Sequence, residues 1–154
     1  MSIDAWRRRA SGLPAAAPSP EYRWPIRFVW ILLATIYLSA GVSKWLGSGL
    51  NYLDPDVMAS FLRQRSFAWY QKPLTDLGYG LADIRWLCTL MAAWTLIAET
   101  AFWTALFSRR AAMVFVPGMF LMHIGIAALL GPQFFQFLSL YVFWIPWGRE
   151  SHDA

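Results

Sequence analysis

Residues 27–46 read RFVWILLATIYLSAGVSKWL, a stretch of twenty residues in which Arg27 and Lys44 are the only charged side chains. A helix needs about 20 mostly apolar residues to cross a hydrocarbon core of roughly 30 Å. Two further stretches meet that requirement, IRWLCTLMAAWTLIAETAFWTALF at 84–107 and AAMVFVPGMFLMHIGIAALL at 111–130, and a fourth, QFFQFLSLYVFWIPW at 133–147, is shorter. The predicted fold class is therefore all-α: an integral membrane four-helix bundle with spans at about 27–46, 84–107, 111–130 and 133–147.

The composition of the 154-residue chain agrees with a membrane protein rather than a soluble one. Hydrophobic residues make up 58%, charged residues only 14%, and the mean hydropathy is +0.40, whereas soluble domains carry about 25% charged residues. A single cysteine excludes an intrachain disulfide and a thiolate cage for a metal, and no metal site is expected. The net charge of +4 is modest and its arginines are scattered around apolar runs, so no nucleic-acid partner is expected.

The segments outside the predicted spans divide the chain into three parts. Residues 1–24 form an N-terminal arm that is rich in Pro, Ala and Ser at 10–20, residues 25–147 form the membrane domain, and residues 148–154 form a short tail. The outer loop at 47–83 contains Asp54-Pro55, a typical helix start. The apolar positions that follow are partly periodic and predict an interfacial amphipathic helix between spans one and two; they are Val57, Met58, Phe61, Leu62, Phe67 and Trp69.

The distribution of basic residues predicts the orientation. With four spans, the arm, the turn at 108–110 and the tail share one side and hold eight arginines, against four basic residues in and beside the outer loop. Cytoplasmic flanks carry the excess of Lys and Arg. We therefore expect a multi-pass protein of the cell (inner) membrane with both termini in the cytoplasm, in contact with the lipid bilayer and with other membrane-protein subunits.

Three ionisable residues fall within the predicted spans, and each is a candidate functional group because an ionisable side chain costs at least about 2.5–3.5 kcal/mol at the centre of a membrane helix. Glu99 shares one helical stripe with Cys88, Ala92 and Thr95, which predicts that it faces the bundle interior. Two interpretations are open: a proton site, or a protonated carboxyl that hydrogen-bonds to a neighbouring helix and fixes packing.

Lys44 and His123 each have a structural and a chemical interpretation as well. Lys44 either extends to the membrane interface or, on a face with Tyr37, Ala40 and Gly41, is desolvated and serves as a base. His123 is either a packed histidine or a second proton-transfer group. Counting helical rise places Lys44 and His123 near the outer surface and Glu99 some 10 Å deeper than His123. A tight triad of the three is therefore not expected, and direct contact with Glu99 requires offset or strongly tilted helices.

The order of these motifs resembles a known family. AGVSK at the end of the first span, Glu99 within AWTLIAETAFW, RRAAM at the start of the third span and His123 within MFLMHIG resemble the four-helix DoxX/DoxD-like membrane family. They resemble more distantly the transmembrane domain of vitamin K-dependent γ-glutamyl carboxylases. The resemblance covers about residues 27–147 and implies quinone-linked membrane chemistry. The likeness of AGVSK to a carboxylase segment whose lysine deprotonates the vitamin K hydroquinone implies that Lys44 is the base. The chain lacks the carboxylase's further helices and lumenal domain, so glutamate carboxylation by this polypeptide alone is not expected.

Two functions follow as alternatives. The first is a quinone-binding subunit of a redox or energy-converting membrane complex, with Lys44, His123 and Glu99 as the chemical groups and an aromatic enclosure for the quinone formed by Tyr37, Trp45, Trp86 and Phe120. The second is a non-catalytic assembly subunit that stabilises a larger membrane complex. A transporter is a third, weaker alternative, because four short spans with one carboxylate are few for an inverted-repeat carrier.

Overall fold

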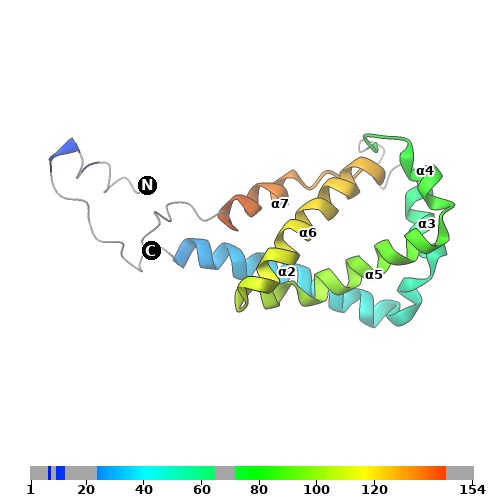
Figure 1. Cartoon of the computed structure of the whole chain (residues 1–154), viewed down its shortest axis with the longest axis horizontal. Helices are drawn as coiled ribbons and strands as arrows, with labels where there is room; N and C mark the ends of the chain where they lie inside the picture. The colour runs from blue at the N-terminus through cyan, green and yellow to red at the C-terminus, as the bar shows by residue number, and fades with distance from the viewer. Residues whose placement is uncertain (1–6, 8–9, 13–23, 65–71, 145–154) are drawn as a thin grey trace.

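The structure is a computed structural model that describes residues 7, 10–12, 24–64 and 72–144, and every extended regular element in these ranges is helical. Figure 1 shows the long helices lying lengthwise, with two short ones gathered at one end. The elements are α2 (Trp24–Gly47), η2 (Gly49–Leu53), α3 (Pro55–Arg63), α4 (Leu77–Ala82), α5 (Arg85–Ala101), η3 (Phe102–Leu106), α6 (Arg109–Leu129), α7 (Phe135–Leu140) and η4 (Tyr141–Trp144).

Three helices are long and apolar enough to cross a membrane, namely α2, α5 with its continuation η3, and α6. They correspond to the stretches predicted at 27–46, 84–107 and 111–130, within three residues at each end. Large apolar side chains are exposed along all three, including Ile31 on α2, Leu90 on α5 and Leu121 on α6. Such surfaces are compatible with contact to lipid.

The fourth predicted span is shorter than expected. In place of a helix over 133–147, α7 and η4 together cover ten residues, Phe135–Trp144, and residues 145–147 lie outside the described part. Gly131 has a positive φ of 106° and is followed by Pro132, so five residues without helix, 130–134, separate α6 from α7. The short segment nevertheless runs back along the long helices (Figure 1), and Trp144 stacks on Trp30 with ring centroids 4.7 Å apart.

The predicted helix after the first span is present as α3. The Asp54 carboxylate accepts a hydrogen bond from the Asp56 amide at 2.9 Å, and Pro55 occupies the first helical position. In the described part, the apolar face of α3 packs against the protein itself, and its position at a membrane interface stays a prediction. Met58 and Leu62 are buried in one cluster with Cys88 of α5, because α5 extends past the end of α2 and α3 covers the part that α2 leaves uncovered. The positions Phe67 and Trp69 lie outside the described residues.

The register between α2 and α5 explains this arrangement. A Cβ added at Gly41 would lie 2.7 Å from the Thr100 methyl group and 2.9 Å from the Thr100 amide nitrogen, so the two antiparallel backbones touch at these residues. The last turn of α2 therefore reaches only the middle of α5. About ten residues at the N-terminal end of α5, or roughly 15 Å of helix, extend beyond it and pack against α3 and α4.

The buried residues form two clusters, one on each side of the Gly41 contact. The end cluster, under α3 and α4, consists of Tyr52, Met58, Ala59, Leu62, Ala82, Cys88, Ala92 and Leu96. The aromatic cluster, between α2, η3, α6 and η4, consists of Leu33, Ala34, Tyr37, Ala98, Phe102, Met119 and Tyr141. Leu96 and Ala98 belong to different clusters, so Glu99 lies close to the boundary between them.

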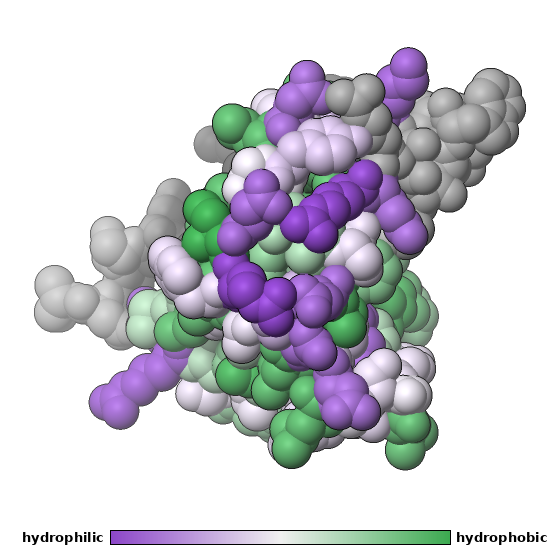
Figure 2. All heavy atoms as spheres, turned by 90° about the vertical axis from the view of Figure 1, so that its right-hand side faces the viewer, coloured by the Kyte–Doolittle hydropathy of each residue, from purple (hydrophilic) through white to green (hydrophobic). Residues whose placement is uncertain are grey.

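The end of the molecule formed by α3 and α4 is polar. Figure 2, which looks onto this end, shows hydrophilic side chains gathered over it and apolar ones at its lower margin. Two exposed ion pairs lie here, Arg63 with Asp83 at 2.8 Å and Arg85 with Asp56 at 2.7 Å. The segment before α4 also caps the C-terminal end of α6, because the amides of Leu74 and Thr75 donate to the carbonyls of Ala127 and Ala128. This end is suited to water.

Candidate functional site

An ion pair lies where the two clusters meet. Lys44 Nζ is 2.5 Å from Glu99 Oε2, and the side chains keep 26% and 9% of their accessible surface. Direct contact with Glu99 was expected only for offset or strongly tilted helices. The helices are offset, because the Gly41–Thr100 contact places the last turn of α2 beside the middle of α5. The prediction that Lys44 extends to an outer interface is not supported, because its ammonium group points inward to Glu99.

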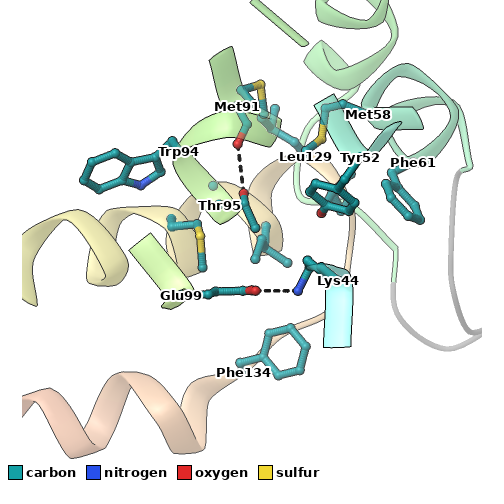
Figure 3. Close-up of a pocket in the computed structure, with 14 residues that line it drawn as sticks. Lys44, Tyr52, Met58, Phe61, Met91, Trp94, Thr95, Glu99, Leu129 and Phe134 are labelled. Atoms are coloured by element: carbon teal, nitrogen blue, oxygen red, sulfur yellow. Dashed lines mark hydrogen bonds and ion pairs between the residues drawn. The ribbon is translucent and has the colours of Figure 1, made fainter. Parts of the chain in front are cut away.

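The ion pair forms one wall of a cavity of about 380 Å³, drawn in Figure 3. This volume is within the range of about 300–1,000 Å³ that is common for small-molecule sites. In Figure 3, Phe134 lies on the opposite side of the ion pair from Thr95 and Met91. The lining residues are mostly apolar: Lys44, Tyr52, Met58, Phe61, Met91, Trp94, Thr95, Glu99, Met122, Gly125, Ile126, Leu129, Leu130 and Phe134.

The polar atoms of the cavity gather at this one wall. The Lys44 ammonium carries three protons and gives one to Glu99 Oε2. Within the described residues, the second carboxylate oxygen of Glu99 has no hydrogen-bond partner. The cavity therefore offers both spare donors and a spare acceptor within a few ångströms, surrounded by apolar side chains.

Two neighbours complete the polar wall. The Tyr52 ring lies 5.9 Å from Lys44 Nζ, in cation–π range. Burial and the nearby Glu99 charge raise the pKa of Tyr52 to about 12, so its phenol stays neutral at physiological pH. The Thr95 hydroxyl donates to the Met91 carbonyl at 2.9 Å.

The predicted polar stripe on the second span is confirmed as an interior face. Cys88 and Ala92 are fully buried, Glu99 is 7% exposed, and Thr95 lines the cavity. The predicted face of the first span is also confirmed, because Gly41 allows α5 to approach closely and Lys44 follows one turn later. Helical spacing thus identified the two residues that carry the ion pair.

His123 is placed elsewhere, in a closed hydrogen-bonded chain at the aromatic cluster. Its Nδ1 lies 2.8 Å from the Met119 carbonyl, its Nε2 lies 3.4 Å from the Tyr37 hydroxyl, and that hydroxyl lies 2.7 Å from the Tyr141 hydroxyl. A carbonyl only accepts, so in a neutral ring Nδ1–H donates to Met119, the Tyr37 hydroxyl donates to Nε2, and the Tyr141 hydroxyl donates to Tyr37. His123 does not line the cavity, and the packed interpretation fits this environment.

The four aromatic residues predicted to enclose a quinone do not line the cavity either. Tyr37 is buried in the aromatic cluster, while Trp45, Trp86 and Phe120 are 44%, 70% and 37% exposed. The aromatic rings that do line the cavity are Tyr52, Phe61, Trp94 and Phe134. Trp94 was accessible to sequence reasoning, since it lies five residues before Glu99 on the same helix. Tyr52 comes from the short η2 and Phe134 from the segment between α6 and α7, and periodicity does not predict how either segment folds back.

Among the residues that the structure describes, no group of three or more His, Cys, Asp and Glu side chains could hold a metal ion. In comparisons with known proteins, no protein-family model, no curated protein and no solved structure matches this chain. The function is therefore argued from the cavity.

Proposed function

We propose that this protein is a small integral membrane subunit that binds a quinone head group in the cavity at Lys44 and Glu99. The observation that carries the proposal is the ion pair itself, which forms the polar wall of an otherwise apolar cavity of about 380 Å³ between helices. Apolar sites with a few well-placed polar groups are typical of small-molecule ligands. A buried ion pair that lines empty space contributes little to packing, since buried pairs are weak sources of stability.

The chemistry of a quinone matches both members of the pair. A quinone oxygen accepts hydrogen bonds, and the Lys44 ammonium has protons to give beyond the one that Glu99 receives. A hydroquinone hydroxyl donates, and the free oxygen of Glu99 accepts. The pair can thus hold either redox form and exchange a proton with it. The Glu99 carboxylate can take a proton from a hydroquinone, and Lys44 can act as the base that the carboxylase resemblance implies once its ammonium has passed a proton to Glu99.

The cavity lining suits the rest of such a ligand. Rings of Trp94 and Phe134 are available to stack or pack edge-on against a planar head group. A long isoprenoid tail exceeds the cavity and would extend into the bilayer. The three long apolar helices support this membrane setting.

The wider setting of the subunit is part of the proposal. We place the protein in the cell (inner) membrane with both termini cytoplasmic, because arginines are in excess in the arm, the turn and the tail. The return of η4 to the N-terminal half of α2, where Trp144 stacks on Trp30, supports an even number of passes. The electron donor and acceptor then belong to partner subunits of a redox complex, as the resemblance implies.

A second candidate function is a non-catalytic assembly subunit. The observation that favours it is the exposure of large aromatic side chains on the outer faces of the helices, with Trp86 at 70% and Trp24 at 67%. Tryptophan is enriched in binding hot spots between proteins. This function needs no ligand in the cavity, which makes the two candidates separable.

The test is a mild-detergent purification of the protein with mass spectrometry of extracted quinones and co-purifying polypeptides. The variant is Lys44→Met, and the matched control is Lys72→Met, because Lys72 is the other lysine of the chain and is exposed. We expect a stoichiometric quinone in the wild type and the control and its loss in Lys44→Met. A fixed set of partner subunits with no quinone in any sample would overturn the quinone proposal and favour the assembly function.

A further inference from the structure

One residue of the cavity lining has no side chain. Gly125 lies in the C-terminal half of α6 and lines the cavity. A Cβ built at this position meets no heavy atom within 4 Å. Met122 and Leu129, three residues before it and four after it, line the cavity as well, as does the adjacent Ile126, so this face of α6 is a wall of the cavity with a gap at its centre.

Two other glycines of the long helices, Gly41 and Gly118, are explained by close contact with a neighbouring element, and Gly125 has no such contact. An added Cβ at Gly41 would collide with the backbone of Thr100, and one at Gly118 would collide with the Trp94 ring. At those positions only glycine fits between the elements. Gly125 also has an ordinary helical backbone, since positive φ values occur only at Gly12, Gly49 and Gly131 among the described glycines.

Glycine inside a helix is less favourable than alanine, because it loses more backbone freedom on folding and adds no side-chain contact. Gly47 and Gly80 share this lack of close packing and of special backbone geometry, but Gly125 alone among the three lines the cavity. The feature that an alanine or a larger residue would change here is the free space of the cavity.

The rest of the lining indicates what this space accommodates. Three of the six methionines of the chain, Met58, Met91 and Met122, line the cavity. Thioethers adapt their shape to a ligand and make favourable contacts with aromatic rings. A single glycine among larger side chains leaves a gap in the wall, through which a planar ring can approach the helix backbone more closely than a branched or puckered molecule can.

We propose that Gly125 is a specificity-determining position, at which the bare backbone of α6 receives the flat face of the ligand's ring while an oxygen at the ring edge meets Lys44 and Glu99. The inference rests on the proposed function and narrows its substrate class to planar ring compounds with an oxygen at the edge. A side chain at position 125 would occupy the space of the ring, so larger side chains should lower the affinity for the ligand more.

The test measures binding of a benzoquinone with one isoprene unit to the purified full chain, by quenching of tryptophan fluorescence, in Gly125→Ala and Gly125→Leu. The matched control is Gly80→Leu, because Gly80 in α4 is exposed, has open space for a Cβ and does not line the cavity. We expect affinity to fall several-fold in Gly125→Ala and at least about tenfold in Gly125→Leu, and to stay unchanged in Gly80→Leu.

Thermal unfolding of the same variants separates a ligand role from a packing role. We expect an unchanged or raised Tm for Gly125→Ala, since alanine favours the helix, and a lowered Tm for Gly118→Ala, whose Cβ has no room beside Trp94. Equal losses of Tm in Gly125→Ala and Gly118→Ala would overturn the inference, because packing would then explain both glycines.

The binding results distinguish failure of the inference from failure of the proposed function. If the probe binds the wild type and Gly125→Leu equally but not Lys44→Met, the quinone site stands and the role of Gly125 is wrong. If the probe does not bind the wild type, both the proposed function and the inference are overturned.

Discussion

Two groups of polar residues lie in the apolar interior of this protein, and they differ in completeness. The Tyr37–His123–Tyr141 chain joins α2, α6 and η4. Each of its N–H and O–H groups has an acceptor within the protein. The Lys44–Glu99 pair joins α2 and α5 and keeps spare donors and a spare acceptor at a cavity. The donors of the first group are all used within the protein, whereas the second group keeps hydrogen-bonding groups free for a ligand.

The difference shows why burial alone does not identify a functional residue. Glu99 and His123 are 7% and 5% exposed, nearly the same. His123 is surrounded by the rings of Phe134, Phe137 and Tyr141, and both of its nitrogens have hydrogen-bond partners. Unused hydrogen-bonding capacity beside empty space, rather than burial, distinguishes the candidate ligand site.

The largest effect on stability is expected from breaking the ion pair on one side. Lys44→Met leaves the Glu99 carboxylate buried without its cation, which costs about 3–5 kcal/mol in fully buried pairs and roughly 1–3 kcal/mol here, because a quarter of the Lys44 side chain is accessible. Chemical unfolding in detergent measures the loss. The double variant Lys44→Met/Glu99→Leu should recover most of it, and a double variant no more stable than the single one would contradict the assigned pairing.

A similar effect, about 1–3 kcal/mol, is expected from Gly41→Ala, which forces the α2 and α5 backbones apart at Thr100. The displacement should also separate Lys44 from Glu99 and weaken ligand binding. The exposed Gly47, with open space for a Cβ, supplies the control Gly47→Ala, which should change neither property. Unchanged stability of Gly41→Ala would show that the two helices do not touch as described.

A smaller loss is expected in the closed chain. Tyr37→Phe removes the donor to His123 and the acceptor of Tyr141, and each unpaired buried polar group costs about 1–3 kcal/mol in soluble proteins and less in membrane helices. We expect a total of about 1–2 kcal/mol, with quinone affinity unchanged. Loss of quinone binding together with normal stability would remove the contrast between the two polar groups.

The smallest loss is expected at the cover of the cavity. Asp54→Ala removes the N-cap of α3, whose residues Met58 and Phe61 line the cavity, and caps contribute about 1 kcal/mol. Asp54→Asn keeps a capping oxygen and should behave as the wild type. Hydrogen exchange of the α3 amides should increase in Asp54→Ala alone, and equal exchange in both variants would exclude a role for the cap.

Helical periodicity predicted the parts of the site that share an element. The stripe of Cys88, Ala92, Thr95 and Glu99 was identified because residues three and four apart lie on one face of a helix, and Lys44 was identified because a charge within an apolar stretch is conspicuous. The partnership of Lys44 with Glu99 was missed. Their contact depends on how far α5 extends past the end of α2. No pattern in the sequence between the two helices, residues 48–84, predicts that offset.

The aromatic residues show the same limit. Trp45 and Trp86 were assigned to the site as rings able to enclose a quinone head group, yet both are exposed. Phe134 and Tyr52 line the cavity because the chain turns at Gly131 and after Gly49. A local turn fixes the direction of the chain but not which distant residue it reaches.

The sequence by itself determined that this chain is helical, that three of its segments are long and apolar enough to span a membrane, and that Asp54 starts a helix between the first two. These are local properties, set by the length of apolar runs, by periodicity and by caps. Only the tertiary structure decided that Lys44 meets Glu99, that His123 is enclosed by Tyr37 and Tyr141, and that the cavity has a bare wall at Gly125. Those depend on the offset between helices, which is set by side-chain contacts between residues far apart in the chain, above all where Gly41 lets α2 touch α5.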